Sequence, residues 1–131
     1  MIEGIGHAGI LVKDLDKAVN LYCGLFGLEP LTKITDWPGE GMKNIMLKVG
    51  NQAFEVMEPT DPQGSLARFL QQRGEGLHHI NLEVSDLGSL VKSLQAKGAT
   101  VLGRGPRFCF LHPKSAGGVL FELIQSTSRG L

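Results

Sequence analysis

The sequence predicts an α+β domain built from two copies of a βαβββ module, and three observations support this prediction. A His-containing strand pattern occurs twice, at His7 and His79, with an offset of 72 residues (79 minus 7). Each copy continues with Asp-Leu and an amphipathic helical pattern. Each copy ends in a strand pattern around a glutamate, Glu55 or Glu122, with an offset of 67 (122 minus 55). A duplication whose second copy is shorter between its helix and its last strand explains both offsets.

The first copy spans about residues 3–60 and begins with a strand over 5–12. A helix follows, because apolar residues then recur at every third or fourth position. Asp14 or Asp16 is expected to cap its start, and Gly27 is expected to end it in a left-handed conformation. Three further strands are expected at about 28–35, 43–49 and 53–58.

A polar linker and a short helix over about 64–74 separate the two copies, with Ser65 as the expected cap and Gly74 as the stop. The second copy spans about 76–126, and its helix is expected to end at Gly98. Short connections favour antiparallel pairing, and the whole chain is expected to form one domain. The strands of this copy are expected at about 77–84, 99–103, 107–112 and 118–124.

Composition narrows the class of protein. A chain of 131 residues that is 42% hydrophobic and 20% charged is large enough to bury a core and is not typical of a disordered protein. Its 13 basic and 13 acidic residues balance, so no charge pattern for nucleic acid or an anionic membrane is present. No apolar run approaches the roughly 18 residues of a membrane span, and no signal peptide is evident. We therefore expect a cytoplasmic protein with no membrane or nucleic-acid partner.

The repeated His and Glu residues predict a divalent-metal site. Side chains alternate along a strand, so His7 and Glu55 can share one face of the first sheet, as His79 and Glu122 can in the second. Two imidazoles and two carboxylates suit Mn²⁺, Co²⁺, Ni²⁺ or Zn²⁺. Taken singly, each of these residues is more often a satisfied core or surface group than a metal ligand. His78 competes with His79, and only the repeat offset favours His79.

Four stretches carry a resemblance to a known family: residues 55–59, 69–80, 110–115 and 117–123. They include the runs His-His-Ile and His-Pro-Lys-Ser. With the duplicated module, they resemble the vicinal-oxygen-chelate superfamily, which includes the glyoxalases, and within it the methylmalonyl-CoA epimerases. The resemblance covers nearly the whole chain. It implies a curved sheet with a metal-binding cleft, and a homodimer.

The resemblance also implies an activity, namely metal-dependent isomerisation of an acyl-CoA thioester by transfer of its α-proton. Inversion at that carbon needs an acid or base on each face. In the family one of these is the last-strand glutamate, here Glu122, and the other comes from a loop where Glu40 is the best candidate. The sequence departs from the family pattern twice. The loop glutamate usually stands where this chain has Gly39, and the stretch 98–110 is short.

Two other functions stay open. The same metal residues would serve a glyoxalase I-type lactoylglutathione lyase, and a non-catalytic small-molecule or antibiotic-binding protein of the superfamily is the third possibility. Within the epimerase interpretation, Lys114, Arg104 and Arg107 are candidates for contacts with the anionic groups of CoA, because long cationic side chains suit phosphate. Solvated surface charges explain these three residues equally well.

Overall fold

The computed structural model describes residues 1–103 and 105–127, which form two compact units. The α1 unit, named for helix α1 (Leu15–Phe26), comprises Ala8–His78. The α3 unit, named for helix α3 (Leu87–Ala96), comprises Met1–His7 and the chain from His79 onward. Strands β1 (Ile2–Leu11) and β5 (Gly76–Val84) contribute residues to both units. Within the described residues, no helix has the length and apolar composition that a membrane span requires.

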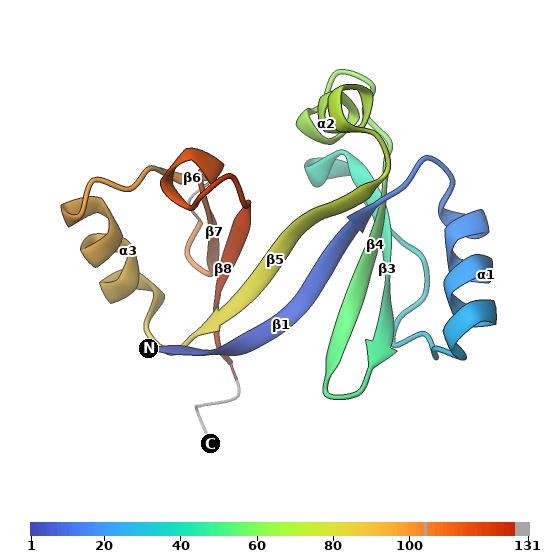
Figure 1. Cartoon of the computed structure of the whole chain (residues 1–131), viewed down its shortest axis with the longest axis horizontal. Coiled ribbons are helices and arrows are strands. Elements are labelled where there is room, and N and C mark those ends of the chain that lie inside the picture. The colour runs from blue at the N-terminus through green and yellow to red at the C-terminus, as the bar shows by residue number, and fades with distance from the viewer. Residues whose placement is uncertain (104, 128–131) are drawn as a thin grey trace. The chain divides into compact units, whose positions relative to one another are not determined.

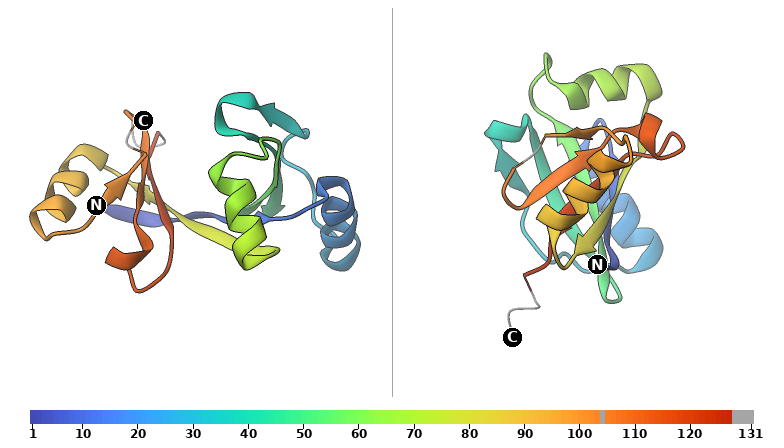
Figure 2. Two further views of the ribbon diagram at one scale, coloured as in Figure 1. Left: turned by 90° about the horizontal axis from the view of Figure 1, so that it is seen from above. Right: turned by 90° about the vertical axis from the view of Figure 1, so that its left-hand side faces the viewer.

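In the α1 unit the strand order is β2-β3-β4-β1, with β2 to β4 joined by antiparallel hairpins. Figure 1 shows α1 alongside β3 and β4. Helix α2 (Ser65–Arg73) then connects β4 to β5, as Figure 2 also shows. The other elements are β2 (Thr35–Trp37), the 3₁₀ turn η1 (Pro38–Glu40), β3 (Met42–Val49) and β4 (Gln52–Pro59).

The α3 unit repeats this order as β6-β7-β8-β5, and the first residues of β1 lie next to β5. Its remaining elements are β6 (Val101–Leu102), β7 (Phe108–Leu111), the 3₁₀ turn η2 (Pro113–Ser115) and β8 (Phe121–Gln125). Strands β6, β7 and β8 pair antiparallel, whereas β5 and β8 pair parallel. The expectation of antiparallel pairing is therefore wrong for β5–β8. The connection between these two strands contains α3 and is long enough to cross over, which parallel pairing requires.

Helices α1 and α3 are anchored at their first turn in the same way. Asp14 caps α1 by accepting from the backbone N–H of Lys17 at 3.1 Å, and Asp86 caps α3 by accepting from Ser89 at 3.1 Å. The first helical N–H is then bound by a side chain at the end of the last strand. Leu15 donates to Oε1 of Glu58 at 2.8 Å, and Leu87 donates to Oε1 of Gln125 at 2.9 Å. Glu58 and Gln125 are 67 residues apart (125 minus 58), the offset of the two glutamates.

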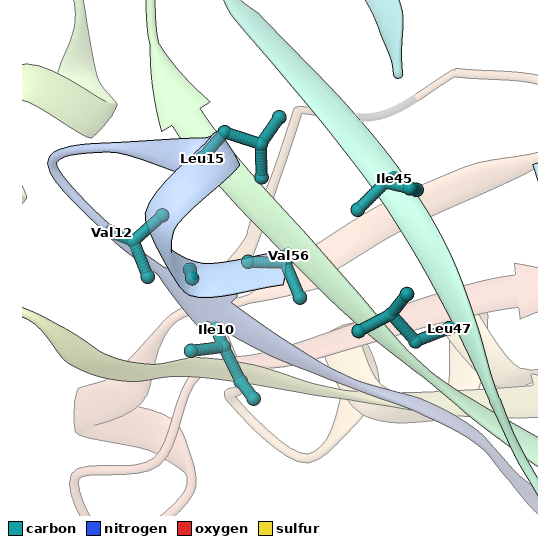
Figure 3. Close-up of a cluster of buried hydrophobic side chains, with 7 residues drawn as sticks. Ile10, Val12, Leu15, Ile45, Leu47 and Val56 are labelled. Carbon is teal, nitrogen blue, oxygen red and sulfur yellow. The ribbon is translucent and has the colours of Figure 1, made fainter. Parts of the chain in front are cut away.

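Each unit has its own hydrophobic core between its helix and its strands. Figure 3 shows the core of the α1 unit, in which Leu15 of α1 faces Val56 of β4 and Ile45 of β3. Full burial of a side chain of this size stabilises the fold by about 1.5–3 kcal/mol. The two clusters consist of Ile10, Val12, Leu15, Ala18, Ile45, Leu47 and Val56 in the α1 unit and Val84, Leu87, Val91, Cys109 and Leu123 in the α3 unit.

Three local predictions are corrected. The strand expected over 28–35 is only a bridge between Pro30 and Leu47, followed by β2. Proline supplies no N–H for a continuous ladder. Ser65 does not cap α2, because the cap position is held by Gly64. The last strand starts at Phe121 rather than 118, because residues 117 and 118 are glycines with φ of 67° and 90° that form a turn.

Candidate metal centre

Two imidazoles meet in the α3 unit. His7 on β1 and His79 on β5 place their Nε2 atoms 3.0 Å apart, and the rings pack edge to face with their centroids separated by 5.1 Å. The His79 side chain is almost fully buried, at 3% exposed, while that of His7 is 16% exposed. Both rings turn Nε2, one of the two imidazole nitrogens that bind metals, toward the same point.

The carboxylate of Glu122 completes this cluster from β8. Its Oε1 lies 3.2 Å from Nε2 of His7 and 3.5 Å from Nε2 of His79, and it accepts from Nδ2 of Asn81 at 3.0 Å. Burial opposes the ionisation of Glu122, but the hydrogen bonds from both imidazoles and from Asn81 outweigh it. Together with the charge of His79 they lower the pKa from 4.5 to about 2. The carboxylate is therefore ionised near neutral pH.

The cluster fits a divalent cation. The ligand atoms of His7, His79 and Glu122 all lie within 4.8 Å of one another. Nitrogen and oxygen ligands bind such ions at about 2.0–2.2 Å, so neighbouring ligand atoms lie about 3 Å apart. The separations of 3.0, 3.2 and 3.5 Å match this spacing. Neutral imidazole and carboxylate are the donors that Mn²⁺, Co²⁺, Ni²⁺ and Zn²⁺ share.

Aromatic packing holds the cluster in place. Phe110 on β7 is the cross-strand partner of Glu122. Its ring packs edge to face on His79, with the centroids 6.2 Å apart. A bulky ring beside a buried imidazole restricts the rotamers of that imidazole and keeps water from its face.

The other predicted ligand and the loop glutamate belong to the α1 unit. Glu55 on β4 is buried, at 9% exposed, and its Oε2 accepts from Nδ2 of Asn44 at 2.7 Å. Oδ1 of Asn44 in turn accepts from Nε1 of Trp37 at 2.8 Å. Glu40 is exposed at the end of η1, which follows Trp37 directly. The carbonyl of Gly41 after it accepts from the N–H groups of Thr60 and Asp61, so both ends of this turn are anchored.

The other histidines and the cationic residues considered in the sequence lie as follows. His78 packs its ring on Phe69 at 4.6 Å between centroids. His112 caps η2, where its Nδ1 accepts from the N–H of Lys114 at 3.0 Å. The side chains of Lys114 and Arg107 are exposed, and Arg104 lies outside the described residues. The short stretch before Phe110 is reflected in β6, which has only two residues.

Two residues of these networks were missed in the sequence. Asn81 lies two positions after His79 on the same strand, so strand alternation already put both on one face. Asn44 reaches Glu55 diagonally across the β3–β4 hairpin, because its direct partner is Met57. This contact depends on the hairpin register, which the sequence did not fix.

Comparison with known proteins identifies the family. The family model of the glyoxalase/bleomycin resistance protein/dioxygenase superfamily matches residues 6–115. The chain belongs to this superfamily. It is 32% identical to the mitochondrial methylmalonyl-CoA epimerase of Homo sapiens over 130 residues, which cover 93% of this chain and 73% of the relative. It is 34% identical to the ethylmalonyl-CoA/methylmalonyl-CoA epimerase of Cereibacter sphaeroides, covering 95% and 99% of the two chains.

Solved structures of the superfamily agree with this assignment. A methylmalonyl-CoA epimerase in complex with methylmalonyl-CoA and NH4+ matches with a TM-score of 0.88 and 32% identity, over 98% of this chain and 97% of that one. A lactoylglutathione lyase of Arabidopsis thaliana is 32% identical, but the match covers only 43% of its length. The predicted family, the duplicated α+β fold and the resemblance to methylmalonyl-CoA epimerases are thus confirmed.

Proposed function

We propose that this protein is a divalent-metal-dependent epimerase that acts on an acyl-CoA thioester of the methylmalonyl-CoA type by transfer of the α-proton. The observation that supports it is the convergence of His7, His79 and Glu122 in one cluster, in a chain that is 32% and 34% identical to two epimerases over 93% and 95% of its length. The lyase match, which covers less than half of its relative, makes the glyoxalase alternative weaker.

His7, His79 and Glu122 would hold the metal, with Glu55 as the predicted fourth ligand. When bound, a cation such as Co²⁺, Mn²⁺, Ni²⁺ or Zn²⁺ supplies a Lewis acid that stabilises negative charge on the substrate oxygens. The protein contributes two imidazoles, a carboxylate whose pKa is lowered to about 2, and burial of the His79 side chain. A partly buried site strengthens each of these electrostatic contacts.

Two carboxylates would move the proton. Glu122, 17% exposed, is accessible enough to take the α-proton from one face of the substrate carbon. Glu40 would return a proton on the other face, since inversion requires an acid on the side opposite the base. Support for Glu40 comes from its exposure and from the anchoring of the turn that carries it. A cytoplasmic homodimer is proposed alongside, and sedimentation of the purified protein tests its oligomeric state.

The test uses one stereoisomer of methylmalonyl-CoA in deuterated water with the metal-loaded protein. We expect the α-proton to exchange with solvent and the stereoisomers to equilibrate, both followed by NMR. The chelator-treated protein should do neither, and metal addition should restore both. Turnover of a glutathione hemithioacetal in place of methylmalonyl-CoA would favour the lyase. Metal binding without turnover of either substrate would favour a binding protein.

A further inference from the structure

The candidate metal centre has a buried amide that the metal-binding function does not itself require. Asn81 is 2% exposed, and its Nδ2 donates to Oε1 of Glu122 at 3.0 Å. This is the same oxygen that faces both imidazoles. The two residues are direct partners in the parallel β5–β8 ladder, so the amide approaches the carboxylate from a fixed strand position.

A glycine on the neighbouring strand β1 makes room for this amide. A Cβ atom at Gly6 would overlap Oδ1 of Asn81 and would lie 3.2 Å from Cγ of Glu83. Gly6 does not have a positive φ, so its backbone conformation does not require a glycine. The space that the Asn81 amide occupies does require one. The backbone of β1 closes against Oδ1, which fixes the plane of the amide and the direction of its N–H groups.

The role of Asn81 is geometric. Its amide donates to the same oxygen of Glu122 that lies 3.2 Å and 3.5 Å from the two imidazoles, so it restricts where that oxygen can lie. A glutamate side chain has three rotatable bonds, and ordering it costs conformational entropy whenever it binds a ligand. A fixed donor on Oε1 removes part of this cost in advance, as partners of metal ligands generally do.

We infer that Asn81 is a positioning residue that holds the Glu122 carboxylate for the metal, and that Gly6 is required because it lets the Asn81 amide fit. This inference rests on the proposed function, since it assigns a purpose to residues around the same site. It adds two residues outside the repeated His–Glu set, and it predicts that their effects are coupled.

A double-mutant cycle tests this coupling. The variants are Gly6→Ala, Asn81→Ala and the double variant, and the probe is Co²⁺, whose affinity is measured by competition with a chelator and whose visible absorption reports its ligands. We expect Asn81→Ala and Gly6→Ala each to weaken Co²⁺ binding by about 10- to 100-fold, the usual effect of losing a partner of a ligand. In the Asn81→Ala background, Gly6→Ala should add less than about twofold, because the overlap with the Asn81 amide is gone and only the 3.2 Å contact with Glu83 remains.

The matched control is Gly4→Ala on the same strand, where an added Cβ would meet nothing within 4 Å. It should leave Co²⁺ affinity and absorption unchanged. Asn81→Ser, which keeps a hydroxyl donor, serves as a second variant, and circular dichroism with thermal unfolding checks that each variant is folded. We expect the Co²⁺ affinity of Asn81→Ser to lie between the affinities of the wild type and Asn81→Ala.

The outcomes separate this inference from the proposed function. If the wild type does not bind Co²⁺, the metal site and the inference are both wrong. If it binds and the folded Asn81→Ala variant retains the same affinity and absorption, only the positioning role is overturned. Additive losses in the double variant would show that Gly6 acts independently of Asn81.

Discussion

The two units are built alike and differ in what surrounds the glutamate on the last strand of each module, Glu55 on β4 and Glu122 on β8. In both, an aspartate caps the helix and a strand-end side chain, Glu58 or Gln125, binds the first helical N–H. Glu122 faces two imidazoles within its own unit. Glu55 is held by Asn44, which is bound to Trp37. The repeated framework therefore places two carboxylates in equivalent positions, and different neighbours give them different surroundings.

The largest effect is expected from replacing the buried imidazole of His79. His79→Ala should abolish turnover and remove most of the metal affinity, because a buried proposed ligand is lost. His78→Ala is the matched control, since its ring packs on Phe69. Calorimetric titration with Co²⁺ and the deuterium-exchange assay measure both properties. Stoichiometric, tight metal binding by His79→Ala would refute the assignment.

The next effect concerns the carboxylate of the η1 turn. Glu40→Gln should reduce epimerase turnover by about 10²- to 10⁴-fold, the usual contribution of a positioned acid or base. Metal affinity should not change, and solvent exchange of the α-proton should persist from one stereoisomer only, because Glu122 still serves one face. Turnover equal to the wild type would exclude Glu40 as the second group.

A third experiment targets the hydrogen bonds around Glu55. Asn44→Ala removes the link between Trp37 and a buried carboxylate, so we expect the unfolding free energy to fall by about 1–3 kcal/mol. Trp37 is the single tryptophan of the chain, and its emission should shift when its indole N–H loses this partner. Urea unfolding followed by fluorescence gives both values. An unshifted spectrum would mean that Trp37 is not held by Asn44 in solution.

The shared helix anchor can be tested by exchanging its two forms. Glu58→Gln converts the anchor of α1 into that of α3, and it should change stability little because Gln125 performs the same function. Glu58→Ala and Gln125→Ala should each cost about 1 kcal/mol in thermal or urea unfolding, since a first-turn N–H loses its acceptor. A large loss in Glu58→Gln would show that the charge, and with it the 3.6 Å pair with Lys43, is essential.

The smallest effect concerns Asp86, the residue that caps α3. Hydrogen bonds from the side chain and backbone of Ser89, aided by Lys92, lower the pKa of Asp86 below 3.8. Because the folded-state pKa is depressed, the stabilisation is present above the unfolded-state value and is lost as the pH falls through the folded-state value. Ser89→Ala should raise the pKa of Asp86 toward 3.8 in a carboxyl NMR titration.

The sequence by itself determined the repeated module and the helices, and it singled out His7, His79 and Glu122, which the structure brings together. These follow from local patterns: apolar spacing places α1 and α3, Asp14 and Gly27 bound α1, and an offset of 72 residues selects His79 over His78. Such features depend on a few neighbouring residues, so they can be recognised without knowing which strands meet.

Only the tertiary structure decided which groups share a site and what surrounds them. The sequence placed His7 and Glu55 on one face of the first sheet and expected all four residues at one metal site. The fold shows how His7 reaches Glu122, because β1 contributes its first residues to the α3 unit. The parallel β5–β8 ladder puts Asn81 on Glu122, and the hairpin register puts Asn44 on Glu55. These contacts join residues far apart in the chain, and strand pairing that no local pattern encodes selects them.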